Sequence, residues 1–266
     1  MLTDTHCHLG SERFSPDEIP ELIAKATDMG VTRLVTLATD EGDQQRNLKL
    51  AQDHPEVYAC LGIHPCDVHE TRDDFESLVE PFLADKKVCA VGETGLDYFH
   101  PAPDGWEEDA YHERQKDFLR RHFAMAKKAG LNIVIHTRDR KGHQSFEDCL
   151  AIYAEFYQEV RAVFHCFPGP PELAQRVIDL GGLVSFTGIV TFKNAEPVVK
   201  TALVVPPESF MIETDAPFLA PIPVRGQRCE PSFTRHTAQK IADLRGIALE
   251  DLATKTNQNA DAFFRF

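Results

Sequence analysis

The chain has 266 residues, of which 42% are apolar and 26% are charged, a balance that suits a globular protein with a large core. Its formal net charge of −14 disfavours sequence-independent binding along a nucleic acid duplex, because such binding needs a broad basic surface. No apolar run approaches the roughly 20 residues that span a bilayer, and no basic segment with an apolar run behind it opens the chain, so we predict a cytoplasmic protein that uses no membrane.

Short apolar, β-branched runs alternate along the chain with segments of helical periodicity. The predicted strands are Met1–Thr5, Val31–Thr39, Val57–Gly62, Val88–Val91, Asn132–Ile135, Val160–Phe164, Gly182–Phe186 and Phe210–Ile212. The predicted helices are Asp17–Met29, Asp40–Asp53, Asp73–Leu83, Glu108–Ala129, Gln144–Tyr157, Pro171–Leu180, Ala195–Thr201, Ser232–Leu244 and Leu249–Phe264. Seven cysteines, none in a C-x-x-C pair, are predicted to be buried, reduced thiols.

This alternation predicts one (β/α)8 TIM barrel over residues 1–266, since such barrels typically have about 250 residues. We find no low-complexity tract, linker or break in composition that would divide the chain. A doubly wound open sheet is the alternative. That fold usually carries a glycine-rich phosphate turn after its first strand, and here the turn is replaced by His6-Cys7-His8.

Polar residues that follow the predicted strands are the candidates for a site, because barrel active sites form at the carboxyl ends of the strands. One strand-end histidine is more often a hydrogen-bonded residue than a ligand, but unpaired titratable groups that converge on one face would be costly. The candidate ligands are His6, His8, Glu93, His136, His165 and Asp215, with His64 beside them. The other histidines are assigned to surface or structural positions: His54, His69, His100, His112, His122, His143 and His236.

Four imidazoles and two carboxylates are too many ligands for one tetrahedral ion. They suit two divalent ions about 3.5–4 Å apart with a bridging carboxylate. His6, His8 and Asp215 would then hold one ion, His136 and His165 the other, and Glu93 would span both. Imidazole-rich ligation favours Zn or Mn, and Mg prefers oxygen ligands, so the residues leave Mg, Mn and Zn open.

Several specific strings accompany these candidates. They are Asp4–His8 with the pattern D-x-H-x-H, Gly62–Pro65, Gly92–Tyr98, Ile135–Arg138, His165–Phe167, Thr187–Phe192 and Glu213–Pro217. With these strings the chain resembles, over essentially its whole length, the TatD family of metal-dependent hydrolases in the amidohydrolase barrel superfamily. Pro168, where the family usually has Ser, and Cys229, where it usually has Asn, are departures that bear on substrate preference.

The resemblance implies a two-metal site with the six ligands named above. It also implies hydrolysis of phosphodiester bonds in nucleic acid, as a Mg-dependent deoxyribonuclease that trims single-stranded 3′ ends. Among the residues, we predict that Asp215 is both a ligand and the general base, that Glu93 positions the metal pair, and that His64 contacts the scissile phosphate or the leaving oxygen.

Substrate contacts are expected from the loops at the mouth of the barrel. Arg138, Arg225 and Arg228 are the predicted phosphate partners. Glu213 is expected to support the ligands from outside, and Trp106 would stack a base or form a lid contact.

Three functions stay open from the sequence. The first is a nuclease acting on single-stranded ends of DNA or of RNA, and the second is a hydrolase of a small ester, amide or lactone that uses the same ions. The third is a binding or assembly module without catalysis. Clustered mouth arginines favour phosphates, whereas a closed apolar pocket would favour a neutral small molecule. No obligate protein partner is implied.

Overall fold

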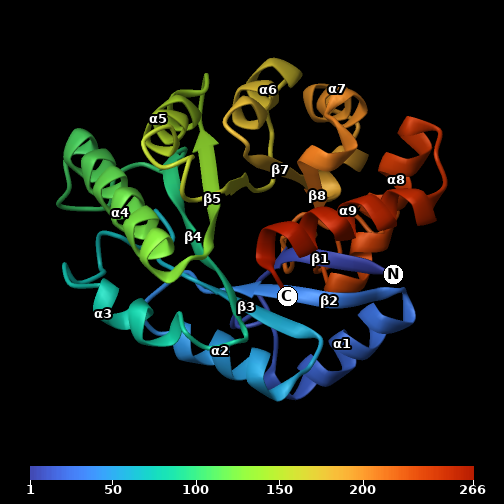
Figure 1. Cartoon of the computed structure of the whole chain (residues 1–266), viewed down its shortest axis with the longest axis horizontal. Helices are drawn as coiled ribbons and strands as arrows, with labels where there is room; N and C mark the ends of the chain where they lie inside the picture. Colours follow the sequence, from blue (N-terminus) through green and yellow to red (C-terminus); the bar gives the residue numbers. More distant parts are fainter.

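The computed structural model describes residues 1–266 and confirms the predicted (β/α)8 architecture, with eight parallel strands inside a layer of helices (Figure 1). The strands pair in chain order and are β1 (Leu2–Cys7), β2 (Val31–Leu37), β3 (Val57–Leu61), β4 (Val88–Tyr98), β5 (Asn132–Asp139), β6 (Ala162–Phe164), β7 (Leu183–Phe186) and β8 (Phe210–Ile212). The helices are α1 (Ile19–Asp28), α2 (Gln44–Asp53), α3 (Glu76–Val79), α4 (Glu108–Ala129), α5 (Gln144–Tyr153), α6 (Pro171–Asp179), α7 (Glu196–Val204), α8 (Thr234–Arg245) and α9 (Leu249–Phe264).

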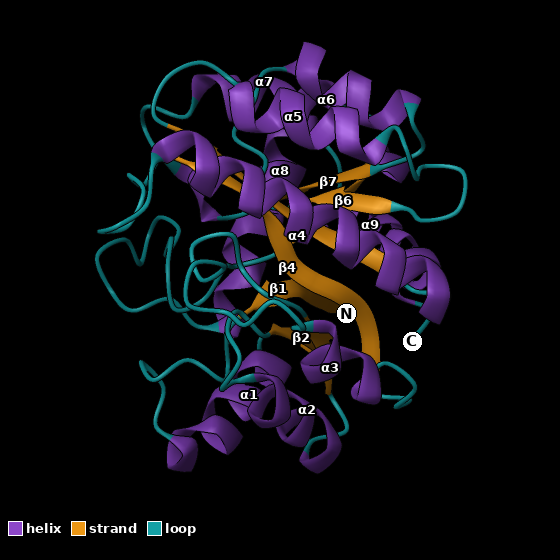
Figure 2. Ribbon diagram, turned by 90° about the vertical axis from the view of Figure 1, so that its left-hand side faces the viewer, coloured by secondary structure: helices purple, strands orange, loops and turns teal.

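The longer loops gather on one side of the barrel, away from the two chain ends (Figure 2). Because the amino terminus leads directly into β1, these loops follow the carboxyl ends of the strands. None of the helices combines the length and apolar character that crossing a membrane requires.

The barrel closes at a seam between β8 and β1. Residues 7 and 216 form a parallel bridge there. The N–H of Asp215 donates to the carbonyl of His6 at 2.9 Å, and the N–H of His8 donates to the carbonyl of Ala216 at 2.7 Å. These bonds lie beyond Ile212, the last residue of β8. The residues that close the barrel are therefore the same ones that carry three of the candidate ligands.

The interior of the barrel changes from apolar to polar along β5, β6 and β8. A buried apolar cluster takes side chains from β2 to β8, among them Val134, Val163 and Met211, together with Phe263 at the end of α9. Side chains alternate between the two faces of a strand, so the next inward positions on β5, β6 and β8 lie two residues further on. Those positions are His136, His165 and Glu213. The apolar floor thus leads directly into the candidate site.

Three strands extend further at their carboxyl ends than the sequence predicts. The ladder between β4 and β5 continues through Gly95–Tyr98 and His136–Asp139, so Glu93 and His136 lie within strands and not after them. Gly95 permits this continuation, because a Cβ atom there would lie 2.0 Å from the carbonyl oxygen of His136. His6 likewise lies inside β1, which ends at Cys7.

The predicted helix Asp73–Leu83 is shorter in the structure. Only Glu76–Val79 is α-helical, and a 3-10 turn over Glu80–Phe82 follows it. Pro81 explains the difference, because proline has no N–H to donate and its ring clashes with the preceding helical turn.

Candidate metal centre

All six candidate ligands converge at the carboxyl ends of the strands, and Glu93 lies at their centre. The Oε2 atom of Glu93 is 3.3 Å from Nε2 of His6 and 3.5 Å from Nε2 of His8. The Oδ1 atom of Asp215 faces the same two nitrogens, at 3.6 and 3.3 Å respectively. These four side chains surround the first half of the site.

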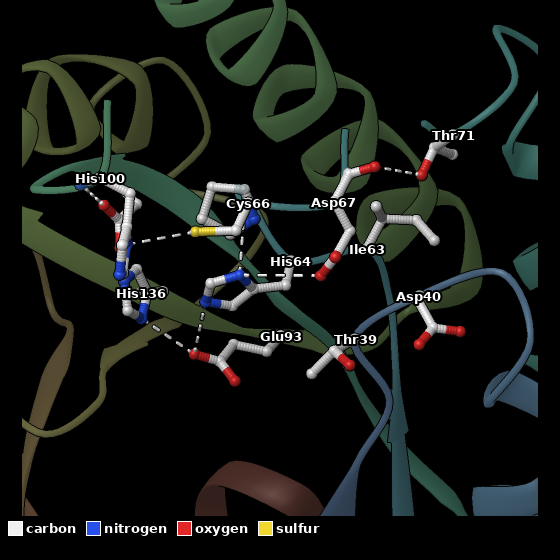
Figure 3. A network of polar contacts seen from close by, with 12 residues as sticks. Thr39, Asp40, Ile63, His64, Cys66, Asp67, Thr71, Glu93, His100 and His136 are labelled. Carbon is white, nitrogen blue, oxygen red and sulfur yellow. Dashed lines mark hydrogen bonds and ion pairs between the residues drawn. The ribbon is translucent and has the colours of Figure 1, made fainter. Parts of the chain in front are cut away.

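The other oxygen of Glu93 faces the second half. Its Oε1 atom is 2.8 Å from Nε2 of His165 and 3.0 Å from Nδ1 of His136. His64 approaches the same oxygen, with its Nε2 atom at 3.6 Å (Figure 3). Glu93 therefore lies between histidines on two sides, with His64 next to His136. The rings of His6 and His165 also stack, with their centres 3.9 Å apart.

For two of the histidines, a hydrogen bond to a group outside the cluster determines which ring nitrogen carries the proton. The other nitrogen then faces the cluster with its lone pair. Nδ1 of His8 lies 3.3 Å from the carbonyl oxygen of Leu37, and Nε2 of His136 lies 3.1 Å from Oδ2 of Asp97. Both partners only accept, so in the neutral rings these nitrogens carry the protons. Nε2 of His8 and Nδ1 of His136 are left as the metal-binding atoms.

The donor set fits positively charged ions. Lone pairs of imidazoles point at carboxylate oxygens and at each other, as at the 3.2 Å contact between Nε2 of His6 and Nε2 of His8. Two acceptors at this distance repel unless a proton or a metal ion lies between them. Ligand atoms within 4.8 Å of one another form three such groups: His6–His8–Glu93, His6–His165–Asp215 and His64–Glu93–His136.

The pKa values follow the same electrostatics. Burial by itself would lower the pKa of His165, but Glu93 and Glu213 overcome it and raise that pKa well above its usual range. Burial would raise the pKa of Glu93, but His165, His6 and His64 hold it well below its usual range. Glu93 is therefore ionised and draws positive charge into the pocket, which a bound cation supplies without protonating the rings.

Asp97 is a residue of this site that is not among the candidates predicted from the sequence. Its Oδ2 atom accepts from His136, while its Oδ1 atom accepts the N–H groups of Phe99 and His100, each at 2.9 Å. The carboxylate is thereby locked and orients the imidazole ring. The signal was present in the sequence, because Asp97 lies four residues after Glu93 on an extended strand and so shares its face.

Two more carboxylates hold the site from outside. Glu213, which was expected in this role, accepts the N–H of Cys166 at 2.7 Å and lies 3.5 Å from Nδ1 of His165. Asp4 accepts both the N–H and the hydroxyl of Thr214, at 2.9 and 2.6 Å, and so joins β1 to the segment that carries Asp215. Burial raises the pKa of Asp4 to about 8.

The predicted phosphate partners differ in their surroundings. The exposed guanidinium of Arg138 lies 4.0 Å from the ring centre of Phe99, and that of Arg225 lies 3.5 Å from the ring centre of Phe192. Neither group forms an ion pair in the structure. Arg228, in contrast, is bound by both carboxylate oxygens of Glu18, at 2.8 and 2.7 Å.

Aromatic side chains also differ at the mouth. Phe218 is 43% exposed, and the centre of its ring lies 6.4 Å from that of His8. Trp106, for which base stacking or a lid contact was considered, is partly buried against the core with Arg114 over its ring at 5.6 Å. Phe218 is thus the more exposed of the two residues, with the guanidinium of Arg13 at 5.0 Å from its ring centre.

The chain is similar in sequence to a known protein family and to metal-dependent hydrolases of two bacteria. Residues 3–265 match the family model described as TatD related DNase. The chain is 35% identical to the metal-dependent hydrolase YabD of Bacillus subtilis (strain 168), covering 100% of this chain and 99% of that protein. It is 33% identical to the metal-dependent hydrolase YcfH of Escherichia coli (strain K12), covering 99% of this chain and 96% of that one.

Solved structures agree with the sequence relatives. The crystal structure of YJJV, a TatD homologue from Escherichia coli, superposes with a TM-score of 0.88 at 26% identity, covering 100% of this chain and 98% of that chain. A TatD family hydrolase from Entamoeba histolytica has the same fold, with a TM-score of 0.84 at 19% identity and coverage of 99% and 97%. With a family model matched over nearly the full length and a cluster of metal-binding side chains at the strand ends, the chain belongs to the TatD family of metal-dependent hydrolases.

Proposed function

We propose that the protein is a two-metal phosphodiesterase that acts on nucleic acid, as a deoxyribonuclease trimming single-stranded 3′ ends. The observation that carries this proposal is the position of Glu93, whose two oxygens face different histidines. A bridging carboxylate of this kind is typical of paired-ion sites that cleave phosphate esters. The family model, described as that of TatD related DNases, supports a nucleic acid substrate.

In this proposal the residues divide as two sets of ligands. His6, His8 and Asp215 would hold one divalent ion, His136 and His165 would hold the other, and Glu93 would contribute a ligand to both. When bound, such a pair polarises the phosphorus–oxygen bonds and lowers the pKa of a coordinated water toward neutrality. The imidazole-rich set suits Zn or Mn, and Mg is the third candidate.

Asp215 is the proposed general base. Its side chain is 16% exposed, compared with 3% for Glu93, so it is the carboxylate of the pair that is more open to an incoming water and substrate. Burial would raise its pKa, but the His8, His6 and His165 side chains lower it, so the group is ionised and ready to accept a proton.

His64 is the proposed hydrogen-bond donor to the phosphate or to the leaving oxygen. Its Nδ1 atom accepts the N–H of Cys66 at 3.1 Å, so its single proton in the neutral ring lies on Nε2, the atom that faces Glu93. Burial lowers the pKa of His64 to about 3, which keeps the ring neutral.

The mouth supports a short single strand as the substrate. Arg138 and Arg225 present guanidinium groups without acidic partners, which suits two phosphates, and the exposed ring of Phe218 suits stacking on a base next to the site. Arg228 would join them only by leaving Glu18. With a net charge of −14, attraction of the substrate has to come from such local groups.

The test is hydrolysis of an end-labelled single-stranded oligodeoxynucleotide with added Mg²⁺, Mn²⁺ or Zn²⁺, alongside the ribonucleotide of the same sequence. We expect metal-dependent shortening from the 3′ end. This shortening should be lost in Glu93→Gln, a variant of the same size in which an NH2 group replaces one carboxylate oxygen. Absence of cleavage under every ion, with hydrolysis of a small ester, amide or lactone, would refute the nuclease and leave a metal-dependent hydrolase of small molecules.

A further inference from the structure

A second cluster of metal-binding side chains lies at the mouth, outside the six candidate ligands. It consists of Cys66, Asp97 and His100, whose ligand atoms all lie within 4.8 Å of one another. The sequence predicts a buried thiol for Cys66 and a surface or structural position for His100. The structure leaves Cys66 only partly buried and brings its sulfur to 3.6 Å from Nδ1 of His100 (Figure 3).

The distances in this cluster fit a tetrahedral thiolate site. With Zn–S near 2.3 Å and Zn–N near 2.0–2.1 Å, a sulfur and a nitrogen on one tetrahedral ion lie about 3.6 Å apart, and a nitrogen and an oxygen about 3.4 Å apart. The corresponding distances here are 3.6 Å for Sγ of Cys66 to Nδ1 of His100 and 3.1 Å for Nδ1 of His100 to Oδ2 of Asp97. Small side-chain adjustments are enough to accept an ion.

The backbone of Cys66 and the carboxylate of Asp97 are held in place before any ion binds. The N–H of Cys66 donates to Nδ1 of His64 at 3.1 Å, and its carbonyl accepts from His69 at 2.9 Å. Asp97 is fixed through its Oδ1 atom by the backbone of Phe99 and His100. A preorganised set of this kind pays little conformational entropy when it binds a ligand.

Access to the cluster is open on one side. The side chain of His100 is 49% exposed, whereas that of Asp97 is 1% exposed. A fourth ligand position can therefore be filled by water from the mouth, as in zinc sites with three protein ligands. The buried oxygen of Asp97 has lone pairs for both an ion and the N–H of His136, which lies 3.1 Å away.

We propose that Cys66, Asp97 and His100 form a third cation site, selective for divalent ions that bind thiolates, such as Zn²⁺ and Co²⁺. Binding releases the thiol proton of Cys66 to solvent. The ion then shares the carboxylate of Asp97 with His136. Mg²⁺ does not bind here, because it prefers oxygen ligands in an octahedral arrangement. This inference does not depend on the identity of the substrate.

The test is titration of the metal-free full-length protein with Co²⁺, followed through the near-ultraviolet charge-transfer band that a thiolate–cobalt bond produces. We expect the band in the wild-type protein and its loss in Cys66→Ala. In His100→Ala the Co²⁺ dissociation constant should rise by about tenfold or more, since losing a ligand costs at least as much as losing an outer partner. Because His100 is exposed, this second variant keeps the fold.

Two controls separate the outcomes. Cys166→Ala removes the other partly buried thiol and should keep the band. Glu93→Gln should also keep it while losing ions from the centre, so failure of the proposed function and failure of this site give different results. Absence of the band in the wild-type protein would overturn the proposal and leave Cys66 as a hydrogen-bonded thiol only. A band that survives in Cys66→Ala would also overturn it.

Discussion

Replacing Asp97 with asparagine should change the protonation of the histidine that faces the second half of the metal centre. Oδ1 of Asp97 accepts two backbone N–H groups at 2.9 Å each, so an asparagine has to keep its carbonyl oxygen at that position. Its amide nitrogen then faces Nε2 of His136, which lies 3.1 Å from Oδ2 of Asp97. Two donors cannot share this contact, so the proton of His136 moves to Nδ1, the atom that faces Glu93.

The size of the effect follows from the bond that is lost. An imidazole nitrogen that carries a proton cannot bind a metal ion. Before an ion can bind to Nδ1 of His136, the proton therefore has to return to Nε2, where it meets the amide N–H groups of the asparagine. A hydrogen bond to a charged group contributes about 1.5–3 kcal/mol. At about 1.4 kcal/mol per factor of ten, the Kd for Mn²⁺ should rise by about 10- to 100-fold. This range agrees with the usual cost of losing a carboxylate behind a metal-bound histidine.

The measurement is calorimetric titration of metal-free protein with Mn²⁺, an ion that does not favour the thiolate of the mouth cluster. Thermal unfolding of the metal-free variant is recorded beside it. Asp148→Asn is the matched control, because Asp148 also accepts a hydrogen bond, from Tyr98 at 2.8 Å, but is not one of the candidate ligands or their partners. Wild-type Mn²⁺ affinity in Asp97→Asn would refute the argument that this carboxylate selects the tautomer.

Three further predictions concern the mouth and the stability of the barrel. Arg138→Ala and Arg225→Ala should each raise the KM for a single-stranded oligonucleotide and reduce the slope of log KM against log salt by about 0.7, the value for one phosphate contact, whereas Arg228→Ala should change the slope less. Phe218→Ala should weaken binding of the same strand by about 1–3 kcal/mol in a fluorescence anisotropy assay, and an unchanged affinity would exclude base stacking. Burial lowers the pKa of His122 from its ordinary 6.5 to about 4, so the unfolded chain takes up the proton first as the pH falls. The free energy of unfolding should therefore decrease between pH 6.5 and 4 by up to about 3 kcal/mol, and urea unfolding of His122→Gln should lack this part of the decrease.

Much of the architecture is readable from local sequence. The apolar runs and the helical periodicity predict the eight strands and their order, because side chains alternate along a strand and parallel neighbours need a crossover. The same alternation places His6 with His8, and the strand-end rule for barrels brings His136 and His165 to one face. The candidate ligand set and its predicted division around Glu93 follow from these two local rules together with the family resemblance.

The sequence by itself determined the barrel and the residues that converge at its mouth, and the tertiary structure decided how they are used. The length of β4, and with it the place of Asp97 behind His136, depends on Gly95 lying against a neighbouring strand. Likewise, the ion pair that engages Arg228 joins residues 210 positions apart. Such long-range contacts leave no periodic pattern in the sequence, because they depend on which loops meet after the barrel closes. For the same reason, only the folded chain brings Cys66, Asp97 and His100 together beside the metal centre.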